Sequence, residues 1–501
     1  MTGRAEQRLK PGLVRQKIRA FPRDQMLQTI ARIAAEQSEI AASQDGPTEA
    51  RISEGMWLQL AGICATSNNN HRNKSVESAA LWELVNAVYL AWSPVIDDPD
   101  NEESWHQYLS YQSYVQMSFQ PEPWPPLMRS LCLFGDSERF GAPILDKSTL
   151  EAILGTTLDS FLRTGFALYA AARMWRGSVH RSSIVDGSLG LALQPLDAQD
   201  ILEVVDRWFA RPIAKLAQAG RDRTRGPDDL WGFNPFYDFP VALLDDGTYV
   251  IPSPRGVLQR LSPQGIYHII GNAERHGRLT LGFQEFGGLL GERFQSYIGE
   301  QLGLIRHATV IPEIEYDNGR KSVDFFVKTP EVVLLVEAKS ISPRHDTRSG
   351  LLPSAGGISA ELDKASRQIT ATAELISAGH ESFREFQGLP LRGLIVTREH
   401  YFNLAMPFIN ERIIPASVPA TILSAQELEH ALGAIVDEPD CGAQLLNSMN
   451  PHLAPVGRAL NPPLAAHNPM LGDMWDKWAD GWPQAPAVES DLPPIEDDSP
   501  A

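Results

Sequence analysis

The segments Ser322–Lys328 (SVDFFVK) and Val332–Ser340 (VVLLVEAKS) are two short apolar stretches, separated by three residues. Valine, leucine and phenylalanine dominate both, and such runs between turn-forming residues are typical of buried strands. Inside them stand Asp324, Glu337 and Lys339. Burying charged groups is costly unless they pair or meet a metal. The sequence therefore predicts two neighbouring strands that carry a polar site.

The sequence on both sides of these strands alternates between helical and strand patterns. Apolar residues at three- and four-residue spacings predict an amphipathic helix over 286–302. The other predicted elements are strands over 308–316, 391–398 and 420–423, a helix over 359–378, and a last helix opened by a Ser424–Glu427 capping box. The order from residue 286 is helix, three strands, helix and strand, which predicts an α/β core with a central mixed sheet.

The three charged residues have the spacing of a metal-assisted hydrolytic site. Glu337 and Lys339 are two apart, so both side chains leave one face of their strand, while Val336 and Ala338 face the packed side. Asp324 lies thirteen residues before Glu337, in the neighbouring strand. Two converging carboxylates form a hard oxygen site suited to Mg²⁺, with Mn²⁺ as a substitute. Lys339 can orient or help deprotonate an attacking water and stabilise the developing charge.

The element order and the segments SVDFFV and LLVEAKS resemble the PD-(D/E)XK nuclease superfamily over about 281–430. The resemblance implies metal-dependent cleavage of a nucleic-acid phosphodiester. It implies Asp324 and Glu337 as catalytic metal ligands, the main-chain carbonyl of Ala338 as a further ligand, and Lys339 as a catalytic residue.

Two accessory residues are implied by the same resemblance. Gln368 matches a helix glutamine that some members aim at the active site, and its alternative is a surface glutamine. Glu292 matches an acidic residue placed beside the metal. The segment GERFQSY departs from the more frequent form, because Gln295 stands directly after the phenylalanine. A solvated helix residue is therefore the alternative for Glu292.

The segment 341–357 (ISPRHDTRSGLLPSAGG) is rich in Ser, Gly and Pro, which disfavour regular structure. It follows the strand that carries Lys339 directly, and it contains Arg344, His345 and Arg348. We expect a mobile loop whose basic residues bind the phosphates of a nucleic acid.

Composition divides the chain into four parts and an α+β multidomain protein is expected. Residues 1–230 read as a helical regulatory or assembly module, 231–280 as a β-containing connector, 281–435 as the nuclease domain and 436–501 as an acidic, Pro-rich, largely disordered tail. Helical runs are predicted over 26–42, 78–92, 150–175 and 198–219. In the tail, Trp475, Trp478 and Trp482 predict a short helix that docks on a partner or on the protein itself, or a chance cluster in a disordered segment.

A net charge of -18 disfavours a nucleic-acid partner for the chain as a whole, but the charge is unevenly distributed. Residues 255–400 hold 17 Lys/Arg and 17 Asp/Glu, whereas 436–501 hold 11 acidic and 2 basic residues. An acidic chain can still bind DNA through a local basic groove. The charged N-terminus and the absence of a long apolar run predict a soluble cytoplasmic protein without a membrane span.

The predicted function is a Mg²⁺-dependent endodeoxyribonuclease acting on DNA. The predicted nuclease domain is joined to a large helical module, and the sequence has no GxxxxGK[ST] phosphate loop. This architecture suggests a bacterial antiviral-defence or restriction-type effector. Alternatives are a DNA-repair or RNA-processing nuclease, and a non-catalytic nucleic-acid-binding module on a nuclease fold. Cutting both strands of a duplex needs two active sites or two visits, which favours a homo-oligomer.

Overall fold

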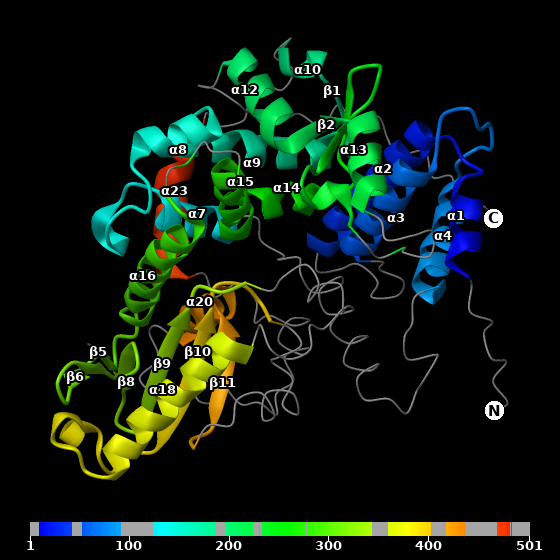
Figure 1. The fold of residues 1–501 in the computed structure, drawn as a ribbon. Coiled ribbons are helices and arrows are strands. Elements are labelled where there is room, and N and C mark those ends of the chain that lie inside the picture. Colours follow the sequence, from blue (N-terminus) through cyan, green and yellow to red (C-terminus); the bar gives the residue numbers. More distant parts are fainter. Residues whose placement is uncertain are drawn as a thin grey trace, which may run out of the picture.

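A computed structural model describes residues 10–42, 53–91, 124–185, 197–223, 230, 233–275, 279, 281–342, 359–401, 417–435, 468–480 and 482. The protein is mixed α and β, with a helix-rich first half and a mixed sheet in the second half, as Figure 1 shows. This confirms the broad α+β class. Within the described ranges, no helix has both the length and the apolar character of a membrane span.

The first half is built mainly from helices. They are α1 (Pro11–Ile18), α2 (Arg23–Ala42), α3 (Glu54–Ser67), α4 (Ser78–Ala91), α7 (Trp124–Phe134), α8 (Lys147–Leu154), α9 (Leu158–Met174), α10 (Ser182–Val185), α12 (Ala198–Val204), α13 (Ile213–Arg223), α14 (Pro254–Leu261) and α15 (Pro263–Arg275). Short 3-10 turns cover Glu138–Phe140 and Pro235–Tyr237, and a π-helical turn covers Val205–Phe209.

Two of the predicted helices are interrupted. The helix predicted over 150–175 is two helices, because Gly155 ends α8 with a φ of 75° and Thr157 caps α9 by accepting from Ser160 N–H. The helix predicted over 198–219 is broken by the strand β2 (Ala210–Pro212). Pro212 has no N–H for a continuous helix, and α13 starts directly after it.

A small sheet crosses the predicted border between the helical module and the connector. Its strand order is β1-β4-β3-β2, with β1 (Ser178–His180), β3 (Val241–Leu243) and β4 (Thr248–Val250). The strands β3 and β4 form a hairpin within the predicted β-containing connector, with Gly247 at a φ of 88° in its turn. They pair with strands from 178–180 and 210–212, so connector and module share one sheet.

The second half has the predicted alternation of helices and strands. Its elements are α16 (Phe283–Leu302), β5 (Thr309–Pro312), β6 (Glu315–Tyr316), β7 (Arg320–Lys321), β8 (Phe325–Lys328), β9 (Val333–Lys339), α18 (Ser359–Ser377), a 3-10 helix Glu381–Phe386, β10 (Leu391–Thr397), β11 (Ala420–Ser424), α20 (Ala425–Ile435) and α23 (Pro469–Ala479). The strand predicted over 308–316 is split, since β6 leaves the main sheet to pair with β7.

The main sheet has the order β11-β10-β9-β8-β5. The strand β8 is antiparallel to both β5 and β9, while β10 is parallel to both β9 and β11, so the sheet is mixed. Alternate residues of β9 face opposite sides. Leu334 and Val336 pack in the core that includes α16 and α20, and Val333 and Leu335 pack in a separate core under α18. The sheet is thus a layer between α18 and the α16–α20 pair.

The core on the α16 side continues into the first half of the chain. It unites α16 and the sheet with α7, α8, α9, α14 and α15. The same core takes in the tail helix α23. The first half and the sheet are therefore packed against each other through a common apolar interior.

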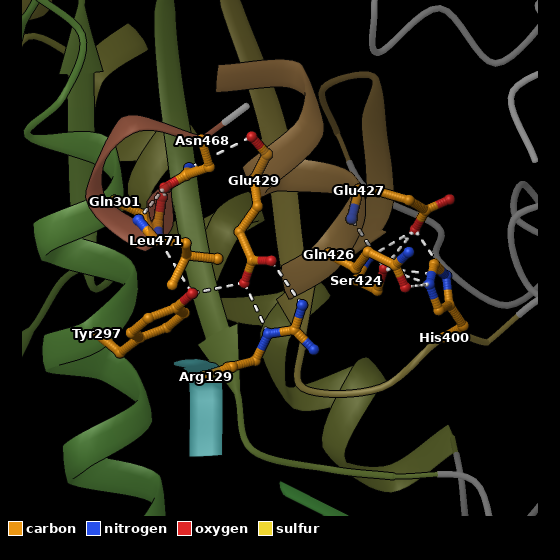
Figure 2. A network of polar contacts seen from close by, with 10 residues as sticks. All are labelled: Arg129, Tyr297, Gln301, His400, Ser424, Gln426, Glu427, Glu429, Asn468 and Leu471. Atoms are coloured by element: carbon orange, nitrogen blue, oxygen red, sulfur yellow. Dashed lines mark hydrogen bonds and ion pairs between the residues drawn. The ribbon is translucent and has the colours of Figure 1, made fainter. Parts of the chain in front are cut away.

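A buried polar network joins the same elements (Figure 2). The guanidinium of Arg129 on α7 donates to both carboxylate oxygens of Glu429 on α20, at 2.7 and 2.5 Å. The Tyr297 hydroxyl on α16 donates to Glu429 Oε1 and accepts from Gln301 Nε2 at 3.0 Å. Asn468 Nδ2, at the start of α23, donates to Gln301 Oε1 at 2.6 Å. Burial opposes the charge of Arg129, but Glu429 outweighs this and raises the pKa of Arg129.

The tail helix α23 lies against the chain itself. Asn468 caps it by accepting from Leu471 N–H. The rings of Trp475, Trp478 and Trp482 surround Phe166 of α9, with centroid distances of 5.4, 6.3 and 5.5 Å. This stretch of the predicted disordered tail is therefore a docked helix, because its tryptophans can be buried on α9. The structure shows the alternative in which the three tryptophans pack on the protein itself.

A second polar cluster lies where β11 passes into α20 (Figure 2). Ser424 and Glu427 form the predicted capping box, with Ser424 N–H donating to Glu427 Oε2 at 2.7 Å. His400 contacts Glu427 Oε2 at 3.4 Å and Gln426 Oε1 at 2.6 Å. Burial opposes both charges, but their attraction outweighs it: the pKa of His400 is raised and that of Glu427 is lowered to about 2.

This pair predicts a pH-dependent contribution to stability. The contribution of His400 is complete below its unfolded pKa of about 6.5 and is lost as the pH rises through its higher folded pKa. We expect His400→Gln to lower the free energy of unfolding by about 1–2 kcal/mol at pH 6 and by less at pH 9. Urea unfolding at both pH values measures this. His380→Gln, which removes an exposed contact with Asp317, is the control. Equal losses at the two pH values would contradict the prediction.

Candidate active site

The structure places Asp324 at the entry of β8, beside the end of β9. Its side chain is 8% exposed. Its Oδ2 accepts the main-chain N–H of Ala338 at 2.8 Å. This bond is possible because β8 and β9 are antiparallel neighbours, with Phe325 opposite Val336. The carboxylate predicted to bind metal is thereby held directly beside the strand that carries Glu337 and Lys339.

Glu337, Lys339 and Gln368 lie together on the α18 side of the sheet. Glu337 is fully buried, on the same face of β9 as Val333 and Leu335. Lys339 Nζ donates to Glu337 Oε2 at 2.5 Å and to Gln368 Oε1 of α18 at 3.3 Å. The amide of Gln368 therefore faces the site and is not a free surface group.

The site disfavours the ionised form of both carboxyl groups, Asp324 and Glu337. Burial, and then the charge of Asp324, raise the pKa of Glu337 to about 8. Burial also raises the pKa of Asp324, against the opposing effects of the Ala338 N–H and of Lys339. Lys339 is one cation facing two carboxyl groups. The site is thus short of positive charge when both are ionised.

One oxygen atom of the site is unsatisfied. Glu337 Oε1 is buried and has no hydrogen-bond partner among the residues that the structure describes. A buried carboxylate oxygen without a donor is costly, and a cation at that position would relieve the cost. Asp324, Glu337 and the carbonyl of Ala338 could hold a hard divalent cation, so the residues present fit Mg²⁺ or Mn²⁺.

The donor set is small. Within the described ranges, no three or more His, Cys, Asp and Glu side chains gather into a metal-binding group. Two carboxylates with a main-chain carbonyl match the usual site of Mg²⁺, which keeps several water molecules and uses few protein ligands. Zn²⁺ would instead favour nitrogen and sulfur ligands.

Glu292 is not brought into this group. It lies exposed on α16, which packs on the face of the sheet opposite α18. There it lines a surface hollow with Arg139, Ser296 and Phe325. The charges that act most on Asp324 are instead those of Lys339, Glu313 and Lys321. The helical periodicity around 292 could not decide which face of the sheet α16 would cover.

The predicted phosphate-binding residues Arg344, His345 and Arg348 lie outside the described residues, which stop at 342 and resume at 359. One residue beside the site was not predicted. Arg398 directly follows β10, and its N–H donates to the carbonyl of Lys339 at 3.3 Å. A charged residue at the end of the apolar run LRGLIVTR was the only signal in the sequence.

Comparisons of the chain with protein-family models, with curated proteins and with solved structures found no match. The function is therefore inferred from the residues of this site and their geometry.

Proposed function

We propose that this protein is a metal-dependent nuclease that hydrolyses DNA phosphodiester bonds, with a core of the PD-(D/E)XK type. The observation that carries the proposal is the buried oxygen Glu337 Oε1, which lacks a donor in the described part of the chain and lies in a carboxyl group that also contacts Lys339. Two carboxylates and a lysine at neighbouring strand ends are costly as structure, and they are useful as a catalytic site.

Each residue of the site has a role that follows from its contacts. Asp324, Glu337 and the Ala338 carbonyl would hold the cation, and the Ala338 N–H keeps Asp324 in place. A bound Mg²⁺ supplies charge stabilisation at the phosphate and a more acidic water. Lys339 donates hydrogen bonds at the edge of the site, where it can orient the attacking water. Gln368 accepts from Lys339 and so fixes the direction of its side chain.

The alternatives differ in how they use the buried charges. A non-catalytic nucleic-acid-binding module needs surface cations and gains nothing from two buried carboxylates that repel phosphate. A DNA-repair or RNA-processing nuclease would use the same chemistry, because the three residues do not distinguish DNA from RNA. The proposed role as an antiviral-defence or restriction-type effector rests on the large helical half beside the nuclease core.

Cleavage of labelled duplex DNA, single-stranded DNA and RNA tests the function. We expect cleavage of DNA with Mg²⁺ or Mn²⁺ and none when EDTA removes the cation. Preferential cleavage of RNA would favour the RNA-processing alternative. Binding of nucleic acid without cleavage under any of these ions would favour the binding module.

Lys339→Ala separates catalysis from cation binding. An ammonium group cannot ligate a metal, so we expect turnover to fall by roughly a hundredfold or more while Mn²⁺ affinity, measured by calorimetry, is largely preserved. Lys328→Ala, which removes a partly exposed lysine of β8 that pairs with Glu385 in the 3-10 helix, is the control and should retain turnover. An equal loss of affinity and turnover in Lys339→Ala would show that Lys339 mainly holds the site together.

The basic residues of the segment 341–357 give a separate prediction. Replacing Arg344 and Arg348 together by Gln should weaken DNA binding and reduce its salt dependence by about two phosphate contacts. The slope of binding affinity against salt concentration, measured by fluorescence anisotropy, reports the change. A double variant with the wild-type slope would exclude this segment as a phosphate clamp.

A homo-oligomer remains part of the proposal, since two active sites are needed to cut both strands in one encounter. Light scattering on the full chain gives the oligomeric state. A monomer with full activity on duplex DNA would contradict the homo-oligomer. It would favour the alternative in which the helical half extends the DNA-binding surface.

A further inference from the structure

The end of the strand β9 is tied to the helical half through one arginine. Because β9 and β10 are parallel with Lys339 opposite Thr397, Arg398 lies one residue beyond their last pair. The carbonyl of Lys339 accepts two main-chain hydrogen bonds, from Arg398 N–H at 3.3 Å and from Ile341 N–H at 2.7 Å. A main-chain hydrogen bond from Arg398 therefore holds the backbone at Lys339, where the chain leaves β9.

The side chain of Arg398 extends this contact to a helix of the first half. Arg398 is only 2% exposed, and its guanidinium stacks 4.7 Å from the ring centre of Tyr267 on α15. It donates to Gln264 Oε1, also on α15, at 3.0 Å. The helix α15 itself packs against α7, α8 and α14, so it belongs to the interior of the first half.

The same guanidinium contacts the residues that follow Lys339. It donates to the hydroxyl oxygens of Ser340 and Ser342, at 3.4 and 3.3 Å. A guanidinium presents its donors in a rigid planar fork, so one side chain can hold several acceptors in fixed relative positions. Arg398 thus connects two parts of the chain that are distant in sequence: the segment after Lys339 and the helix α15.

We infer that Arg398 is a positioning residue for the nuclease reaction, through which the helical half sets the orientation of Lys339. The inference rests on the proposed function. The side chain of Arg398 contacts Gln264 on α15 and the two serines, whereas Lys339 contacts Gln368 on α18. Its effect is on placement. A misplacement of a catalytic group by about 1 Å can cost roughly a hundredfold in rate.

The test compares Arg398→Met with a matched buried arginine. Arg260 on α14 is 5% exposed, lies 6.0 Å from the ring centre of Trp208 and donates to the Trp208 carbonyl at 3.2 Å. In Arg398→Met we expect kcat on DNA to fall roughly 10- to 100-fold, with DNA affinity in EDTA unchanged within about twofold. In Arg260→Met we expect stability to fall and kcat of the folded protein to be retained.

Two further variants test the route through α15. Arg398→Lys keeps the charge but lacks the planar fork, so it should recover little of the lost kcat. Gln264→Leu removes the acceptor on α15 and leaves the two serines in place, so it should lower kcat by a smaller factor. If the helix acts through Arg398, the double variant Arg398→Met with Gln264→Leu should be no slower than Arg398→Met alone.

A measurement independent of activity follows the same contact. Amide hydrogen exchange at Ile341 and Ser342 should accelerate in Arg398→Met and not in Arg260→Met, because Arg398 donates to Ser340 and Ser342 and Arg260 lies on Trp208. An active wild type with unchanged kcat and unchanged exchange in Arg398→Met would overturn the inference alone. A wild type that cleaves no nucleic acid would overturn the proposed function, and the role of Arg398 in catalysis with it.

Discussion

Replacing Glu337 by glutamine is expected to abolish cleavage and, in the same variant, to stabilise the metal-free protein. Cleavage should fall by roughly a thousandfold or more, because an uncharged amide is a poor ligand for Mg²⁺. The gain in stability has a separate cause. Burial raises the pKa of Glu337 from 4.5 to about 8, so the folded state disfavours the ionised carboxylate. Glutamine keeps the shape and removes the charge.

The sign of the pH dependence follows from that raised pKa. Above pH 4.5 the unfolded chain ionises Glu337 freely, whereas the folded chain ionises it only near pH 8, so wild-type stability falls across this range. The variant lacks this loss. We expect Glu337→Gln to exceed the wild type in free energy of unfolding by roughly 1–3 kcal/mol at pH 8 and by little at pH 4.5.

Glu313→Gln is the matched control. Glu313 is a partly exposed carboxylate that pairs with Lys321 at 2.8 Å, close enough to act on the charge of Asp324. Its replacement should retain cleavage and should not stabilise the protein. Added Mg²⁺ should raise the melting temperature of the wild type and of Glu313→Gln, and not of Glu337→Gln. Retained cleavage in Glu337→Gln and in Asp324→Asn would refute the site assignment.

Replacing Arg129 by methionine is expected to have the largest effect on stability. It removes the guanidinium from a pair in which the two side chains are 4% and 1% exposed, and leaves the charge of Glu429 buried. Breaking a buried pair on one side costs about 3–5 kcal/mol. The exposed pair between Arg139 and Glu300, which also joins the first half to α16, is the control. Arg139→Met should cost at most about 1 kcal/mol.

The double variant Arg129→Met with Glu429→Met separates lost charge compensation from lost packing. Replacing both partners by apolar residues is often close to neutral, so part of the loss should be recovered. The hydroxyl of Tyr297 would still lose its acceptor, so recovery is expected to be incomplete. Urea unfolding of the three variants measures these differences. A single variant Arg129→Met within 1 kcal/mol of the wild type would contradict the expectation.

The contacts of Arg129 also limit where the chain can be truncated. A chain that begins near residue 231 lacks α7 and Arg129, and it exposes the part of the shared core that α7, α8 and α9 cover. We expect such a fragment not to unfold cooperatively. The helical half therefore cannot be removed cleanly to test regulation. Point variants at a contact that joins the two sides of residue 231, such as Arg139→Met at the pair with Glu300, are better suited.

The sequence predicted the strands around the site well, for a local reason. The runs Phe325–Val327 of β8 and Val333–Val336 of β9 are continuously apolar, and the candidate site residues Asp324, Glu337 and Lys339 lie at the ends of these runs. Glu337 and Lys339 share a face because the side-chain period of a strand is two. A short connection makes β8 and β9 antiparallel neighbours, and this pairing places Asp324 beside Ala338.

Features that depend on distant contacts were not predictable in the same way. The pairing of Arg129 with Glu429 joins residues 300 positions apart, and no local pattern marks either residue. The small sheet draws its strands from 178–250, and each is only three residues long. The face covered by α16 was decided by packing, which leaves Glu292 exposed on the side of the sheet opposite α18.

The long separation between these partners has a consequence for biosynthesis. Arg129 is made 300 residues before Glu429, and Asp159 is made 319 residues before Trp478, to which it is hydrogen bonded. At 5–20 residues per second, translation of that interval takes roughly 15–60 s. During this time the nascent helical half has neither the counterion for Arg129 nor the helix that covers α9. Its apolar surfaces stay open to chaperones until Glu429 and Trp478 have been synthesised.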